Sequence, residues 1–250
     1  MLNEDALQRA LSAAGLTAPV RWDEVTESTN ATALTMAAQG TPPWTLVAAG
    51  HQTAGRGRQG RAWIDRPGSA LMFSLVLRPP RDAERVGLVS LAAGAAMAEA
   101  ASELSTRAIR CKWPNDLMMG ERKVGGILGE AEVGTGRIGH LVLGIGVNLD
   151  EPEDVAGAGA IGHVDDEGLL TAFLQRFRST IEGAPEEILG RWRAVSATIG
   201  RRVEATTVGG DTASGVAADL DETGALLIDT GGGVVRVAFG EIQHLDVNQG

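Results

Sequence analysis

The chain has 250 residues, 44% of them hydrophobic, which suits one medium domain with a sizeable core and a small appendage. Its 22 basic residues stand against 32 acidic ones, and the net charge of −10 argues against general binding to nucleic acid. The single cysteine, Cys111, excludes an intrachain disulfide and fits a reducing compartment. No segment approaches the roughly 20 apolar residues that span a bilayer, and the N-terminus lacks a signal-peptide pattern, so we expect a cytoplasmic protein.

Apolar periodicity and turn residues predict an α+β fold, with helices and strands first and short strands afterwards. In chain order, the first part is predicted to contain an amphipathic helix with Leu2, Ala6, Leu7, Ala10 and Leu11 on one face, a helix from residues 28–30 to Gly40, strands over 45–50 and 70–77, a helix over 87–104, a strand leading into a turn over 109–119, paired strands over 124–132 and 138–149, and helices over 167–182 and 185–195. From 202 to 247, turn signals recur at about ten-residue spacing, which predicts a small β-barrel or sandwich. We therefore place two domains, at 1–198 and 199–250.

The most distinctive segment is 55–61, Gly-Arg-Gly-Arg-Gln-Gly-Arg, which places three glycines and three arginines between two predicted core strands. Glycine lets the backbone approach a ligand closely, and arginine offers a planar fork of donors to phosphate or carboxylate oxygens. In an acidic protein this positive island suits a small anion better than a polyanion. A solvated basic loop is the alternative, but a charged, glycine-rich segment between core strands favours a binding site.

Ser28, Thr29 and Asn30 precede a predicted helix and are good N-cap residues. A helix N-terminus also presents free N–H donors. These three residues therefore either only cap the helix or also hold a polar ligand.

Three later segments combine polar residues with glycines or a rigid turn. In 112–116, Lys-Trp-Pro-Asn-Asp, Asp116 is either a Mg²⁺ ligand or part of a solvated turn. Lys123 enters a strand beside two glycines, which leaves space for a ligand. Residues 144–148, Gly-Ile-Gly-Val-Asn, again allow close approach, and Asn148 is a candidate donor to a phosphate or ribose. Neither the dinucleotide-binding fingerprint nor a Walker A pattern occurs.

Together with residues 27–30 and 52–61, and in this order, these segments resemble the biotin protein ligases along most of the chain. Arg191 and Trp192, followed by a small β region, are similar to that family's C-terminal module. The resemblance implies a mixed-sheet catalytic domain flanked by helices, with a small SH3-like β-barrel domain. It also implies that biotin reacts with ATP, assisted by Mg²⁺, to give biotinyl-5′-AMP, without a tightly bound prosthetic group. The biotinyl group then passes to one lysine of a biotin carboxyl carrier protein, a subunit of acetyl-CoA or acyl-CoA carboxylase.

By similarity, Lys123 touches both the biotin carboxylate and the α-phosphate, and Arg56 and Arg58 lie on a lid loop that becomes ordered when ligands bind; these three are the predicted catalytic residues. The predicted biotin contacts are Ser28, Thr29, Asn30, Gln52, Gly55, Arg56, Gly57, Arg58, Lys123 and Gly126. The predicted ATP contacts are Arg58, Arg61, Trp63, Lys112, Asn115, Lys123 and Asn148, and the predicted Mg²⁺ ligand is Asp116. Two tryptophans have open roles. Trp63 either covers the purine or packs the end of the loop, and Trp113 either walls the biotin chain or belongs to the core.

Some members of the family also repress transcription through an N-terminal DNA-binding domain. Only 26 residues precede Glu27, fewer than the roughly 50 of a small domain. We therefore expect a monofunctional ligase without nucleic-acid or membrane partners, as a monomer or a homodimer.

Other functions fit parts of the pattern. A lipoate- or octanoate-transferring relative shares the fold and the second step, but segments 55–61 and 112–116 favour biotin. The short segment ahead of residue 27 disfavours a ligand-sensing transcription factor, and the cations with Asp116 disfavour a non-catalytic biotin-binding module. A thioester on Cys111 is disfavoured because a lone strand cysteine is usually a small buried hydrophobe. The four histidines (His51, His140, His163 and His244) lack metal-ligand spacing.

Overall fold

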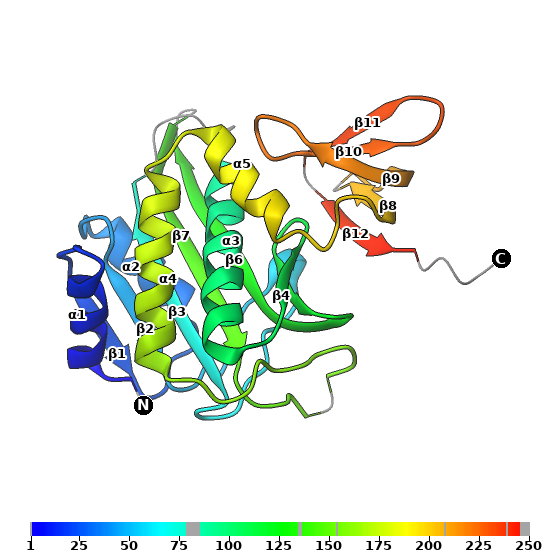
Figure 1. Ribbon diagram of the computed structural model, residues 1–250. Coiled ribbons are helices and arrows are strands. Elements are labelled where there is room, and N and C mark those ends of the chain that lie inside the picture. Colours follow the sequence, from blue (N-terminus) through cyan, green and yellow to red (C-terminus); the bar gives the residue numbers. More distant parts are fainter. Residues whose placement is uncertain are drawn as a thin grey trace.

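The computed structural model describes residues 2–78, 86–134, 137–153, 155–207, 209–238 and 240–245. Within these ranges the chain forms a seven-stranded sheet and a five-stranded sheet (Figure 1). Residues 246 and 247, at the end of the predicted β segment, lie outside the described ranges.

The seven-stranded sheet is mixed, because β1 and β2 run parallel and the other neighbouring strands run antiparallel. From one edge to the other its strands are β1 (Val20–Asp23), β2 (Leu46–Ala49), β3 (Ala70–Leu77), β7 (Arg137–Asn148), β6 (Arg122–Gly134), β5 (Asp116–Met119) and β4 (Ile109–Lys112). The predicted α+β class with a mixed sheet is confirmed. The sequence did not predict β1, because this four-residue edge strand is only partly covered and has no apolar run.

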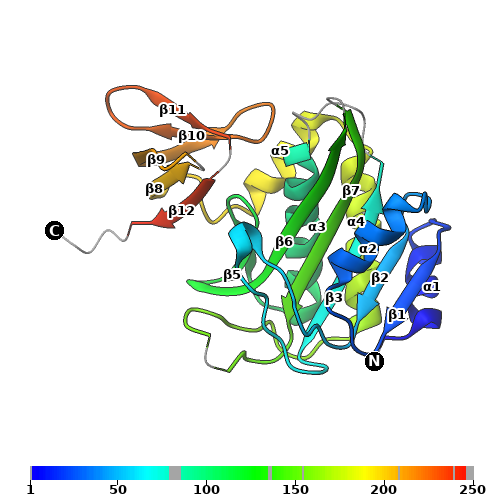
Figure 2. The ribbon, with the colours of Figure 1, turned by 180° about the vertical axis from the view of Figure 1, so that it is seen from behind.

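Helices cover both faces of this sheet, unequally. Four lie on one face (Figure 1): α1 (Glu4–Ala13), α3 (Val86–Ser105), α4 (Asp166–Ile181) and α5 (Pro185–Ala194). The fifth, α2 (Thr29–Ala38), lies on the other face (Figure 2). All eight residues of β3 are buried, since alternate side chains meet helices on opposite faces. Phe73 packs on Phe173 of α4, whereas Val76 packs with Ala33 of α2.

Local sequence explains where these helices begin. The Asn3 side chain accepts a hydrogen bond of 2.8 Å from Ala6 N at the start of α1, and the Asp165 side chain accepts one of 3.0 Å from Gly168 N at the start of α4. Each cap satisfies a backbone donor that has no partner within the helix. Acidic residues follow in the first turn of both helices, where their negative charge interacts favourably with the positive end of the helix dipole.

The five-stranded sheet is antiparallel throughout and follows α5. Its strands, in spatial order, are β11 (Val234–Val237), β10 (Leu226–Asp229), β9 (Thr212–Leu220), β8 (Arg202–Thr207) and β12 (Gly240–His244). The short, closely spaced strands match the turn signals in the sequence.

Trp113 joins the two sheets. Its ring Nε1 donates to Gly224 O at 3.0 Å, in the turn between β9 and β10, and its backbone N donates to Thr198 Oγ1 at 3.0 Å. The residue is 2% exposed and belongs to the core, and one side of it lines a cavity between the sheets. Gly224 lies so close to α3 that an added Cβ would come within 2.6 Å of Leu91 Cδ1. These contacts hold the smaller sheet beside the larger one. Among the described residues, no helix is long and apolar enough to cross a membrane.

Candidate active site

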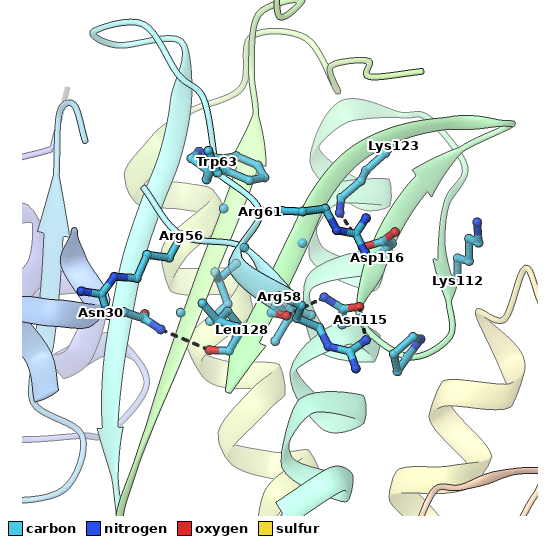
Figure 3. A pocket seen from close by; sticks show the side chains of 18 of the residues that line it. Asn30, Arg56, Arg58, Arg61, Trp63, Lys112, Asn115, Asp116, Lys123 and Leu128 are labelled. Carbon is cyan, nitrogen blue, oxygen red and sulfur yellow. Dashed lines mark hydrogen bonds and ion pairs between the residues drawn. The ribbon is translucent and has the colours of Figure 1, made fainter. Parts of the chain in front are cut away.

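A cavity of 340 Å³ opens where the loop after β2, the β4–β5 turn, β6, β7 and β12 meet (Figure 3). It brings together nearly every residue that the sequence suggested as a ligand contact. These are Ser28, Thr29, Asn30, Gln52, Arg56, Gly57, Arg58, Arg61, Trp63, Lys112, Asn115, Asp116, Lys123 and Gly126. Gly55 and Asn148 do not line it; Gly55 is buried and lines a second cavity beside the arginine loop.

The N-terminus of α2 forms one polar end of the cavity. Gln52 Oε1 accepts hydrogen bonds from Thr29 N at 2.7 Å and Thr29 Oγ1 at 3.2 Å, so Gln52 caps the helix from another segment. Ser28, at the N-cap position, makes no capping hydrogen bond with its own side chain. Ser28 therefore does not cap the helix through its hydroxyl, and its contact with a ligand stays a prediction.

Asn30 is fixed by two residues that the sequence did not single out. Its Nδ2 donates to Glu130 Oε2 at 2.7 Å, and its Oδ1 accepts from the buried Ser74 hydroxyl at 2.6 Å. The Asn30 side chain also fills the space over Gly144, where an added Cβ would lie 2.1 Å from Oδ1. Ser74, Glu130 and Gly144 thus set the orientation of the amide.

The arginine loop has a defined path across the cavity. Gly57 N donates to Arg61 O at 2.7 Å, and the short 3₁₀ helix η1 (Arg58–Gly60) forms the tip. Gln59 has a positive φ of 55°, and Gly60 follows with a φ of 74°. At the base, an added Cβ on Gly55 would come within 2.6 Å of Trp63 O, so only glycine fits there.

The Trp63 ring lies against β7 (Figure 3). A Cβ on Gly146 would come within 2.8 Å of the ring, so the missing side chain makes room for the indole. The Trp63 Nε1 is buried and has no hydrogen-bond partner among the described residues. The indole therefore packs the end of the loop and also forms a wall of the cavity, and a purine contact stays a prediction.

Three of the cations at the cavity lie beside carboxylates. Lys123 Nζ donates to Asp116 Oδ1 at 2.6 Å, Arg61 pairs with Glu241 of β12, and Arg56 lies 3.7 Å from Glu130. These pairs place a negative charge next to each of three side chains that are expected to bind anions.

Arg58 differs from these three because its partners are neutral. Its guanidinium donates to Asn115 Oδ1 at 3.1 Å and to Gly240 O at 3.2 Å. Burial lowers the pKa of the Arg58 guanidinium, although Asp116 opposes this effect. With only neutral partners, Arg58 keeps its charge available to an anion in the cavity.

The backbone of Lys123 is held by a loop that the sequence did not connect with it. Lys123 N donates to Gly157 O and Gly159 N donates to Lys123 O, both at 2.8 Å. The Asn148 amide is 7% exposed and donates to Gly159 O at 2.9 Å, outside the cavity. In this arrangement Asn148 supports the Lys123 segment, and its predicted contact with the nucleotide remains a prediction.

Cys111 is not placed for chemistry. It is buried, and desolvation raises the pKa of its thiol, which disfavours the reactive thiolate. This supports the expectation that no thioester forms there.

β12 contributes a part of the wall that the sequence did not indicate. Glu241, Ile242 and Gln243 line the cavity, although Glu241 lies 95 residues beyond Gly146, the last of the other lining residues. No motif marks these residues, because their place depends on how the two sheets dock.

Two family models match the chain. The model of the Biotin/lipoate A/B protein ligase family matches residues 22–148, and that of the Biotin protein ligase C terminal domain matches residues 198–245.

Named relatives match over most of their length. The chain is 31% identical over 242 residues to the bifunctional ligase/repressor BirA of Bacillus subtilis, covering 89% of this chain and 73% of that one. It is 33% identical over 235 residues to the biotin–[acetyl-CoA-carboxylase] ligase of Mycobacterium tuberculosis, covering 88% and 86%. Among solved structures, the biotin protein ligase of Aquifex aeolicus in complex with biotin and ATP superposes with a TM-score of 0.78 at 25% identity, covering 91% of this chain and 99% of that one. The chain therefore belongs to the biotin protein ligases, a family of ATP-dependent biotin–[acetyl-CoA-carboxylase] ligases.

Proposed function

We propose that this protein joins biotin to ATP to form biotinyl-5′-AMP and then transfers the biotinyl group to one lysine of a biotin carboxyl carrier protein. The observation that carries the proposal is the cavity itself. It gathers five cationic side chains and the polar N-terminus of α2 around one space, in a chain whose net charge is −10; the five are Arg56, Arg58, Arg61, Lys112 and Lys123. Such a site suits two anions that must meet.

In the first step a carboxylate oxygen of biotin attacks the α-phosphorus of ATP. A new P–O bond forms, the bond from the α-phosphorus to its leaving oxygen breaks, and pyrophosphate departs with the electron pair. Because both reactants are negatively charged, cations between them stabilise the transition state. We assign that position to Lys123, which would exchange Asp116 for the two substrates, and we assign the lid to Arg56 and Arg58.

The polar end and the rest of the cavity suit the other parts of the substrates. Ser28, Gln52 and Asn30 offer donors and acceptors for a ureido ring, and Ile127 and Leu128 offer apolar surface for its chain. Arg61 and Lys112 are assigned to the phosphates. Trp63, Asn115 and Asn148 are assigned to the rest of the nucleotide.

Asp116 is the proposed Mg²⁺ ligand. No cluster of three His, Cys, Asp or Glu side chains suited to a metal occurs among the described residues, so further ligands would have to come from the substrate or from water. One carboxylate fits Mg²⁺, which proteins often hold through one or two carboxylates together with substrate phosphates. Bound there with ATP, the ion would neutralise charge on the phosphates.

The second step needs no protein nucleophile. The carrier's lysine attacks as the neutral amine at the acyl carbon of biotinyl-5′-AMP, a C–N bond forms, AMP leaves with the electrons of the cleaved C–O bond, and the nitrogen loses its extra proton to solvent. Holding the two reactants together supplies much of the rate. A closed lid keeps water from the mixed anhydride until the carrier arrives.

Mass spectrometry of a carboxyl carrier domain, incubated with the protein, biotin, ATP and Mg²⁺, tests both steps. We expect one biotinyl group on one lysine of the carrier and biotin-dependent release of pyrophosphate. A carrier whose acceptor lysine is replaced by arginine is the matched control. If lipoate or octanoate competes better than biotin in pyrophosphate release, the assignment of substrate is wrong.

The remaining expectations about partners are tested separately. We propose a cytoplasmic enzyme, monomeric or homodimeric, that does not bind DNA. A gel shift at low salt tests DNA binding, and light scattering with and without biotin and ATP measures the oligomeric state.

A further inference from the structure

Three cationic side chains that the proposed reaction needs for binding substrate anions each lie beside a carboxylate of the protein itself. Lys123 is paired with Asp116, Arg61 with Glu241, and Arg56 lies near Glu130. A cation placed to bind a substrate phosphate is most useful when it is held in position beforehand, and an internal carboxylate does this. The same carboxylate must then give up the cation when the substrate arrives.

Glu241 differs from the other two carboxylates because it comes from the five-stranded sheet. β12 meets the loop at two points: Arg61 pairs with Glu241, and Arg58 donates to Gly240 O at 3.2 Å. The Glu241 side chain is 37% exposed and that of Arg61 is 60% exposed, so their partnership is weak enough to be exchanged. Glu241 also lines the cavity, beside the arginine that is assigned to the phosphates.

We propose that Glu241 is an internal counter-ion that holds Arg61 while the nucleotide is absent and competes with the phosphates of ATP, and with pyrophosphate, for this one arginine. The inference rests on the proposed function, because it assigns Arg61 to the phosphates. It gives the five-stranded sheet a part in the reaction: β12 binds the loop before ATP arrives and recovers Arg61 as pyrophosphate leaves.

The competition has a cost and a benefit. While Glu241 holds Arg61, ATP binds more weakly than it otherwise would, by the free energy of one exposed ion pair. For the same reason pyrophosphate binds more weakly, so the product leaves more easily and the reverse reaction is suppressed. Biotin does not contact Arg61 in the proposed site, so its affinity is independent of Glu241.

Isothermal titration of the full chain with ATP and with pyrophosphate, both with Mg²⁺, tests the proposal. Glu241→Gln keeps the size of the side chain and removes its charge. We expect this variant to bind ATP and pyrophosphate more tightly by a similar factor of about two to five, the range of an exposed ion pair, with biotin affinity unchanged. In turnover, the KM for ATP falls while that for biotin does not.

Glu204→Gln is the matched control. Glu204 lies on β8, opposite Gln243 of β12, and accepts a hydrogen bond from Ser214 Oγ, so this change removes the same charge from the same sheet outside the cavity. We expect it to leave both affinities unchanged. An equal gain in both variants would mean that the net charge of the sheet acts, and the proposal would fall.

The Arg61→Gln background separates competition for Arg61 from direct repulsion of the nucleotide. With Arg61 neutral, the added change Glu241→Gln should have no further effect on ATP affinity; a persistent gain overturns the proposal. Weaker ATP binding by Glu241→Gln also overturns it, because Glu241 would then assist the nucleotide. These titrations measure equilibrium binding, so an error about the carrier or the second step does not imitate any of the outcomes.

Discussion

Removing the charge of Lys123 should separate catalysis from stability. Lys123 Nζ lies 2.6 Å from Asp116 Oδ1, but the two side chains are 40% and 25% exposed. Because the lysine is more than one third exposed, solvent screens the pair, and it contributes about 0.2–1 kcal/mol to stability. For a chain of this size Lys123→Ala should therefore lower the Tm by no more than about 4 °C.

The effect of Lys123→Ala on adenylation should be much larger. Losing one preorganised group that stabilises charge in a transition state costs about 100- to 1,000-fold in rate, or about 2.7–4 kcal/mol. The variant also leaves the Asp116 carboxylate without its cation in a cavity that must admit ATP. We therefore expect biotin-dependent ATP–pyrophosphate exchange to fall at least 100-fold.

The assay combines exchange kinetics with thermal unfolding followed by circular dichroism. Arg110→Ala is the control, since it removes one positive charge from an exposed position on β4. It should leave exchange within about twofold, because surface changes away from special contacts have small effects. A folded Lys123→Ala protein whose exchange stays within tenfold of the unchanged protein would refute the role assigned to this lysine.

Three further predictions concern the walls of the cavity and its neighbour Cys111. Gly144→Ala places a methyl against the Asn30 amide at the polar end of the cavity and should raise the Kd for biotin, whereas Gly146→Ala displaces the Trp63 ring and should raise the Kd for ATP. In each case the overpacking costs about 1–3 kcal/mol. Titration of both variants with both ligands measures the effect, and equal effects on the two ligands would contradict this division of the site. Arg58→Gly removes the hydrogen bonds to Asn115 and β12 and should increase free biotinyl-5′-AMP and labelling of bystander lysines several-fold, measured by chromatography and mass spectrometry; unchanged retention of the adenylate would exclude the lid role. Cys111 should resist iodoacetamide in the folded protein from pH 7 to 9, because burial raises the pKa of its thiol and keeps it protonated; rapid alkylation under native conditions would show that the thiol is accessible.

Local patterns in the sequence were sufficient for most of the elements. The helix predicted over 87–104 is α3 (Val86–Ser105), and the strand predicted over 70–77 is β3 (Ala70–Leu77). These elements are long and strongly patterned, so neighbouring residues carry enough information to define them. β1 escaped prediction because a short, half-covered edge strand is stabilised by its partner β2.

The sequence also determined which residue types belong together, since the arginine loop and the glycine pairs carry their chemistry in local spacing. It did not determine what holds them. Glu130 contacts Asn30 across 100 residues, Arg58 contacts Gly240 across 182, and Ser74 fixes an amide on a different element. Only the pairing of β3, β6 and β7 and the docking of β12 bring these groups within hydrogen-bond distance. The physical reason is that residues close in the sequence set the local backbone conformation, whereas the strands and sheets that meet in space set the partner of a buried or charged side chain.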